Sequence, residues 1–270
     1  MRGHRLLSIG LVAIVAACSP GSDDAGPASG GAATPTVSAP VAPTSFPIEE
    51  SVVAEPGAIA EGTLMIDGAQ VDYVTITPDG FEPGDTAPVL LAFPPGGQSI
   101  GTTRSVAQDT YLREATERGW VVFSPAAPVG GDLWYQESRL LVSSLLDWIE
   151  TWAVPEGGAV HVAGISNGGL STFAAAALTP DRVQSLLTFP GFPRGDEAQD
   201  ALPALVDVPV RMFVGETDDG WVEPMQRAAD TLDELGGDVT LEIMAGEGHV
   251  IGALSDGTRI FDELDAIRDT

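Results

Sequence analysis

A serine, a histidine and a pair of aspartates in this chain could together form and break a covalent bond to a carbonyl carbon. Ser166 lies in Gly164-Ile165-Ser166-Asn167-Gly168, a G-x-S-x-G motif. A serine hydroxyl is a poor nucleophile unless a histidine accepts its proton and a carboxylate orients that histidine. This glycine spacing is typical of a serine held in a sharp turn, because side chains two residues away would collide there. Ser166 is therefore the candidate nucleophile.

The motif occurs twice, and its surroundings separate the two copies. The second copy is Gly97-Gln98-Ser99-Ile100-Gly101, and the two prolines before it interrupt any strand. Ser166 instead follows the apolar run 160–163 and precedes the alanine-rich stretch 169–178. This order predicts a strand-to-helix turn at Ser166 and a loop position for Ser99.

The supply of histidines leaves one candidate base. His4 lies in an N-terminal segment that we expect to be removed, and His161 falls within the strand that leads to Ser166, where packing is the commoner role. His249 follows the last predicted strand in a glycine-flanked loop. We expect His249 to be the base, the alternative being an ordinary surface histidine.

The candidate acids are two adjacent aspartates. Asp218 and Asp219 follow an apolar strand, and only one of them can turn toward the histidine. The other would favour the N-terminus of the next helix, where a carboxylate interacts well with the helix dipole.

Strands and helices alternate from about residue 52 to the end of the chain. The pattern predicts strands at 63–66, 71–77, 88–93, 120–123, 160–163, 184–189, 210–214 and 239–244, and helices at 105–118, 140–152, 169–178, 223–235 and 256–268. Pro224 is expected in the first turn of its helix. Such alternation predicts an α/β architecture, with an open, mostly parallel, doubly wound sheet of about eight strands and helices on both faces. Ligands of such sheets lie at the carboxyl ends of the strands.

Composition narrows the class of protein. With 270 residues, 44% of them hydrophobic, the chain can fill one sizeable core, and we expect a single catalytic domain at 48–270. The formal charge is −27, and all twelve basic residues are arginine. This charge disfavours binding to nucleic acid or to an anionic lipid surface. The chain has a single cysteine, Cys18, and only two histidines lie outside the N-terminal segment, which argues against a transition-metal site; no cofactor is expected.

The N-terminus resembles a bacterial lipoprotein signal. Arg2 and Arg5 precede an apolar stretch, 6–17, that ends at Cys18. The resemblance implies removal of residues 1–17 as a signal peptide and lipidation of Cys18, with the protein held outside the cytoplasm on the cell membrane. An ordinary signal peptide or an N-terminal anchor helix is the alternative. The Pro-, Gly-, Ala-, Ser- and Thr-rich stretch that completes 18–47 is predicted to be a disordered linker.

Residues 60–270 resemble an α/β-hydrolase. GISNGG preceded by VHVA is similar to the nucleophile turn of the polyhydroxybutyrate depolymerase and feruloyl esterase-like group. GISNGG and GETDDGWVEP also resemble serine peptidases of the prolyl-oligopeptidase type, although Gly220-Trp221 stand where those peptidases have an arginine. The peptidase resemblance implies that Asp218, the first of the pair, is the acid, with Asp219 as the alternative. The order Ser166, Asp218, His249 is that of α/β-hydrolases.

The same resemblance implies donors for a tetrahedral oxyanion. The backbone N–H of Asn167 is one, by its position at the start of a helix. The second is implied to come from the loop after the strand at 88–93, from either Gly96 or Gly97. Aromatic residues near strand ends could line a substrate pocket or complete packing, namely Trp134, Tyr135, Phe192 and Trp221.

These observations predict a monomeric serine hydrolase that cleaves small or polymeric carboxylic esters through an acyl-enzyme on Ser166. His249 is expected to act as base and then acid, and Asp218 to orient it. The alternatives are a serine peptidase and a non-catalytic binding lipoprotein on the same fold.

Overall fold

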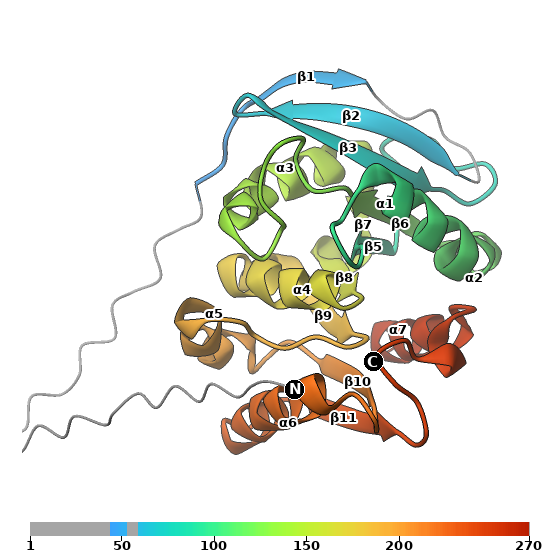
Figure 1. Cartoon of the computed structure of the whole chain (residues 1–270). Coiled ribbons are helices and arrows are strands. Elements are labelled where there is room, and N and C mark those ends of the chain that lie inside the picture. The colour runs from blue at the N-terminus through green and yellow to red at the C-terminus, as the bar shows by residue number, and fades with distance from the viewer. Residues whose placement is uncertain (1–43, 53–58, 270) are drawn as a thin grey trace, which may run out of the picture. The chain divides into compact units, whose positions relative to one another are not determined.

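The computed structural model describes residues 44–52 and 59–269, without the side chains of 49–52. Their main feature is a nine-stranded sheet in the order β1-β2-β3-β6-β5-β8-β9-β10-β11 (Figure 1). Its strands are β1 (Ile48–Val52), β2 (Ala60–Ile66), β3 (Ala69–Ile76), β5 (Val89–Phe93), β6 (Val121–Pro125), β8 (Val160–Gly164), β9 (Val183–Thr188), β10 (Val210–Gly215) and β11 (Val239–Met244).

The sheet is parallel from β6 to β11 and antiparallel from β1 to β6. Every residue of β5, β6 and β8 is buried, as expected for central parallel strands covered on both faces. The predicted mostly parallel sheet is confirmed. Strand β1 and the separate short pair β4 (Thr86–Ala87) and β7 (Val154–Pro155) were not predicted, because they lack a long apolar run.

Helices cover both faces of the sheet, as predicted (Figure 1). Helices α3, α4 and α6 pack on one face over a core that includes Phe93, Trp148 and Leu232. Helices α1, α2 and α7 pack on the other, around Trp120 and Phe261. The helices are α1 (Ile100–Val106), α2 (Leu112–Arg118), α3 (Val142–Trp152), α4 (Asn167–Leu178), α5 (Asp196–Asp200), α6 (Asp219–Glu234) and α7 (Thr258–Arg268), and a π-helical turn, Ala107–Tyr111, joins α1 to α2.

Two helix starts differ from prediction by more than two residues. Helix α1 begins at Ile100, not near 105, because the Ser99 hydroxyl accepts a hydrogen bond from the N–H of Thr102 at 3.2 Å and caps the first turn. Helix α6 begins at Asp219 instead of 223, so Pro224 lies inside the helix. Its missing N–H costs that helix one internal hydrogen bond.

The folded part begins before residue 48. The N–H of Phe46 donates to the Ser144 hydroxyl of α3 at 2.6 Å, and Ser45 bonds to Asp147. The last residues of the predicted linker therefore contact the domain. Across residues 44–52 and 59–269, no helix has the length and apolar character to cross a membrane.

Candidate active site

Ser166 occupies the turn between β8 and α4 in a strained backbone conformation, with φ 58° and ψ −118°. Its flanking glycines are required by close approach of other backbone. A Cβ on Gly164 would lie 2.2 Å from the carbonyl oxygen of Gly168, and a Cβ on Gly168 would lie 2.1 Å from that of Phe93. Any side chain at either position would displace the turn, which explains the motif.

The turn is also tied to the loop after β9. The N–H of Ser166 donates to the carbonyl oxygen of Pro190 at 2.9 Å. Gly169 lies against the same loop, since a Cβ there would fall 2.2 Å from the Pro190 oxygen. Contacts from β8, α4 and the 189–195 loop thus fix the position of Ser166, the candidate nucleophile.

The structure brings together the three predicted residues at the carboxyl ends of their strands. His249 Nε2 lies 2.8 Å from Ser166 Oγ, and His249 Nδ1 lies 2.8 Å from Asp218 Oδ2. The Asp218 side chain is 10% exposed and that of His249 is 42% exposed, so the acid is sheltered while solvent reaches the histidine. Because Asp218 accepts from Nδ1–H, the Nε2 lone pair is left to accept the serine proton.

The loop that carries His249 and the loop that carries Asp218 contact each other closely. A Cβ on Gly215 would lie 2.2 Å from the Gly248 oxygen, so the two loops meet backbone to backbone. The Thr217 N–H and hydroxyl both donate to the Glu247 carbonyl oxygen. The Glu216 carboxylate accepts from the N–H of Gly246 at 2.8 Å. These contacts fix His249 and Asp218 relative to each other.

The two aspartates are not equivalent. Asp218 precedes α6 and bonds to His249, whereas Asp219 is exposed in the first turn of α6. Asp219 therefore has the position that favours a carboxylate near a helix N-terminus. The geometry favours Asp218 as the orienting acid.

The expected oxyanion donors lie beside the candidate nucleophile, Ser166. Asn167 is the first residue of α4, where helical N–H groups lack partners within the helix. Its side-chain Nδ2 donates to the Gly96 carbonyl oxygen at 2.9 Å, which ties the nucleophile turn to the 94–98 loop. Gly96 and Gly97 are both exposed, and φ of Gly96 is +61°. This loop can present a second N–H next to that of Asn167.

Several solved structures share the fold of this chain. The chain resembles an S-formylglutathione hydrolase from Agrobacterium tumefaciens, with a TM-score of 0.59 and 18% identity over 82% of this chain and 98% of that one. It resembles an acetyl xylan esterase from Paenibacillus sp. R4, with a TM-score of 0.61 and 14% identity over 83% and 89%. The chain has the α/β-hydrolase fold.

A thermostable esterase shares this fold, with a TM-score of 0.59 and 17% identity over 77% of this chain. The match spans 61% of that esterase's length. No protein-family description and no curated protein sequence matches the chain. At these identities the α/β-hydrolase neighbours establish the fold, while the chemistry rests on the site itself.

Sequence reasoning missed Gln98, which supports the 94–98 loop. Gln98 is fully buried with φ +51°. Its Nε2 donates to the carbonyl oxygen of Pro94 and to the Ser171 hydroxyl of α4, and its Oε1 accepts from the N–H of Trp134. Pro94 belongs to the 94–98 loop itself, whereas Ser171 belongs to α4 and Trp134 to a third segment. The Gln98 side chain therefore fixes the loop against two other parts of the chain.

For the ester hydrolysis predicted from the sequence, Gln98→Leu is expected to lower kcat about 10- to 100-fold, because a loosened loop would no longer hold the expected oxyanion donor in place. Ser171→Ala, which removes only one of the partners, is the matched control and should change kcat far less. Steady-state kinetics beside thermal melts would decide. An unaltered kcat in a folded Gln98→Leu protein would show that the loop needs no such support.

The two tryptophans predicted to line a pocket have different surroundings. Trp134 is fully buried, its ring lies 5.9 Å from that of Phe93, and its Nε1 donates to the Ala126 oxygen, so it packs in the core and offers substrate no surface. Trp221 is half-buried, with its ring centroid 5.0 Å from that of His249 and 5.2 Å from that of Phe192. Of the pair, only Trp221 adjoins the candidate site.

His161 is a core residue, as predicted. It is almost completely buried, its Nδ1 lies 2.7 Å from Ser185 Oγ, and its ring packs on the edge of Trp120. Burial, with a smaller contribution from the positive charge of Arg268, lowers the pKa of His161 from 6.5 to about 4. The folded protein thus keeps this imidazole neutral.

The low pKa of His161 predicts acid sensitivity. The unfolded chain binds a proton at His161 below pH about 6.5 and the folded chain only below about 4, so stability falls as pH drops through this window. The loss is about 3 kcal/mol across it. Urea unfolding at several pH values, compared with His161→Gln, would measure it. Carboxylates titrate in both proteins, so only the difference between them reports on His161. If the free energy of unfolding fell equally with pH in the wild type and in His161→Gln, the expectation would be contradicted.

Among the described residues, no cluster of three or more His, Cys, Asp or Glu could hold a metal ion. The predicted lipidation site, Cys18, lies outside the described residues.

Proposed function

We propose that this chain is a serine hydrolase that cleaves carboxylic esters through an acyl-enzyme on Ser166. The observation that carries the proposal is the continuous hydrogen-bonded series from Ser166 through His249 to Asp218, with both links at 2.8 Å. Within that series each residue has the partner that its chemistry requires.

In the first half of the reaction, Ser166 Oγ attacks the carbonyl carbon while His249 Nε2 takes the hydroxyl proton. The tetrahedral oxyanion accepts hydrogen bonds from the Asn167 N–H and from Gly96 or Gly97. The bond to the leaving oxygen breaks as His249 returns the proton to it, which releases the alcohol and leaves the acyl group on Ser166. Asp218 holds the imidazole in the required tautomer and stabilises its protonated form.

In the second half, His249 Nε2 takes a proton from a water molecule, whose oxygen attacks the acyl carbon. The new oxyanion collapses, the bond to Ser166 Oγ breaks, and His249 gives its proton back to that oxygen. The carboxylic acid leaves and the enzyme returns to its starting state. The 42% exposure of the His249 side chain is consistent with ready access of water.

The neighbours with this fold are mostly ester hydrolases but include a putative dipeptidyl aminopeptidase IV, so the preference for an ester over a peptide is part of our proposal. Those described above are esterases and an S-formylglutathione hydrolase. A peptidase of prolyl-oligopeptidase type would use the same three residues, and a non-catalytic binding protein would keep the fold without turnover. Substrate tests separate these alternatives.

The decisive experiment combines active-site labelling with a substrate panel. A fluorophosphonate probe should modify the protein, and mass spectrometry should find the adduct on the peptide that contains Ser166. Turnover of short acyl esters with none of short peptides would support the esterase. Peptide turnover at comparable kcat/KM would favour the peptidase, and absence of both label and turnover would favour the binding protein.

We also propose that lipidated Cys18 holds the enzyme on the outer face of the bacterial cell membrane. The basic, apolar and cysteine-terminated order of residues 2–18 supports this placement. Cys18→Ala should abolish incorporation of labelled fatty acid and release the protein from the membrane fraction. Retention of both in that variant would exclude a lipid on Cys18.

A further inference from the structure

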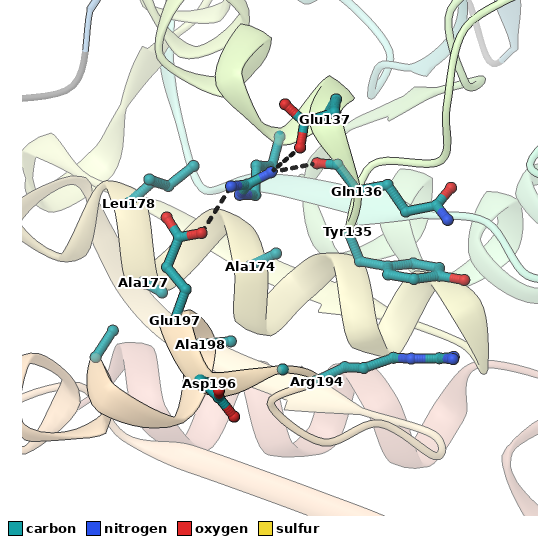
Figure 2. Close-up of a pocket in the computed structure, with 13 residues that line it drawn as sticks. Tyr135, Gln136, Glu137, Ala174, Ala177, Leu178, Arg194, Asp196, Glu197 and Ala198 are labelled. Atoms are coloured by element: carbon teal, nitrogen blue, oxygen red, sulfur yellow. Dashed lines mark hydrogen bonds and ion pairs between the residues drawn. The ribbon is translucent and has the colours of Figure 1, made fainter.

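A cavity of about 360 Å³ lies along α4, beyond the nucleophile. Ala174 and Leu178 line one side of it, and the segments around 135–139 and 194–201 form its walls (Figure 2). Its volume is in the range of small-molecule sites. With a rise of 1.5 Å per residue, Ala174 lies about 12 Å along the helix from Ser166.

Arg194 on the wall of this cavity differs from the other described arginines. Arg2 and Arg5 lie outside the described residues, and nine of the remaining ten arginines form ion pairs with acidic side chains. Arg194 alone among those ten has no such ion pair, although the chain contains 39 acidic residues. An exposed guanidinium left unpaired amid such an excess of carboxylates is available to an anion.

Aromatic contact holds that guanidinium in place. Arg194 Cζ lies 5.4 Å from the centre of the Tyr135 ring, a cation–π geometry. Figure 2 shows the two side chains extending in the same direction from opposite walls, so that the guanidinium and the phenolic hydroxyl lie at the same end of the cavity. Both groups can donate hydrogen bonds.

The acidic residues around the cavity leave Arg194 free. Glu137 and Glu197 lie at the other end (Figure 2), and both form ion pairs with Arg139. The Asp196 carboxylate lies apart from the Arg194 guanidinium in the same view. At one end of the cavity a guanidinium is thus shared by two carboxylates, and at the other end the Arg194 guanidinium has no carboxylate partner.

Arg194 is also connected to the candidate catalytic residues. It follows Pro190, whose oxygen accepts from the N–H of Ser166, and Phe192, whose ring packs on Trp221 beside His249. Gly191 lies against Gly169 of α4, and three residues of chain span at most about 10 Å. One substrate could therefore reach from Ser166 to Arg194.

We propose that this cavity binds a carboxylate group of the substrate, which pairs with Arg194 and Tyr135 while the ester lies at Ser166. The inference rests on the proposed esterase function and adds a substrate class to it. Preferred substrates are then esters whose free carboxylate lies on the order of 10 Å from the scissile carbonyl, which is about the chain span from Gly191 to Arg194. A planar guanidinium can bind both carboxylate oxygens, which favours this anion.

The test compares charged and neutral esters of equal length. One series places the carboxylate on the acyl side: para-nitrophenyl monoesters of succinic, adipic and sebacic acid are the charged substrates, and their methyl esters are the neutral ones. A second series places the carboxylate on the alcohol side: O-acetyl ω-hydroxy acids are the charged substrates, and their methyl esters are the neutral ones. Arg194→Ala should raise KM for the longer charged esters about tenfold, leaving kcat and the neutral esters nearly unchanged. Arg227→Ala is the control, because it removes the same charge from the exposed, paired Arg227 of α6.

The outcomes separate the two proposals. If neutral esters are hydrolysed but neither charged series depends on Arg194 more than on Arg227, the carboxylate site is wrong and the esterase stands. If no ester is hydrolysed, calorimetric titration of monomethyl sebacate into Ser166→Ala protein decides. Binding that Arg194→Ala abolishes and Arg227→Ala preserves supports the site, and absence of binding overturns it.

Discussion

Replacing Ser166 by alanine is expected to lower kcat for ester hydrolysis by about 10⁵-fold or more, because no other group can form the acyl intermediate. KM should change little, since the hydroxyl contributes almost nothing to ground-state binding. The remaining rate would come from the oxyanion donors and from substrate binding. The measurement is steady-state hydrolysis of a short para-nitrophenyl ester, with protein purified away from host esterases.

The second G-x-S-x-G motif supplies a matched control for this experiment. Ser99 caps α1 through its hydroxyl, so Ser99→Ala should destabilise the fold by about 1 kcal/mol and leave kcat nearly unaltered. Circular dichroism melts would check that both variants fold. If Ser99→Ala removed activity and Ser166→Ala kept it, the nucleophile would be assigned to the wrong motif.

The candidate site was predictable where local sequence determines position. Ser166 is marked by a strand before it and a helix after it, and by glycines that close backbone contacts require. His249 could be identified as the candidate base because the chain contains only three histidines. Asp218 was favoured over Asp219 only by resemblance, and the contact with His249 agrees with that choice.

Contacts between distant segments were not predictable. The partners of Gln98 include Ser171, 73 positions away, and no periodicity or spacing signals such a bond. Its buried position beside two exposed glycines has no sequence signature either. Sequence could not choose between a pocket and a packing role for Trp134, because a tryptophan near a strand end can turn either to the cleft or to the core; the structure buries it in the core.

Which arginines pair with the many acidic side chains can be read only from the folded structure. From sequence, a charge of −27 excludes some partners but does not identify a ligand. The structure shows that Arg118 contacts three carboxylates while Arg194 contacts an aromatic ring. The cationic groups that can bind an anionic substrate are therefore the arginines that form no ion pair within the protein.

Replacing Asp218 by alanine is expected to lower kcat about 10⁴-fold, because His249 loses both its tautomer selection and the charge that stabilises its protonated form. The fold should persist, since Thr217 and Glu247 still join the two loops. Asp219→Ala is the matched control, one residue away with the same change of charge. It should cost about 0.3–1 kcal/mol of stability through the helix dipole, with little change in kcat.

The comparison of these two variants distinguishes a specific contact from a general electrostatic effect. Asp218 Oδ2 lies 2.8 Å from His249 Nδ1, and Asp219 lies exposed on α6. If negative charge near the histidine were sufficient, the two substitutions would lower kcat to a similar extent. A larger loss for Asp219→Ala would mean that His249 changes partner when substrate binds. We expect kcat to fall only with Asp218, because one carboxylate alone reaches the imidazole.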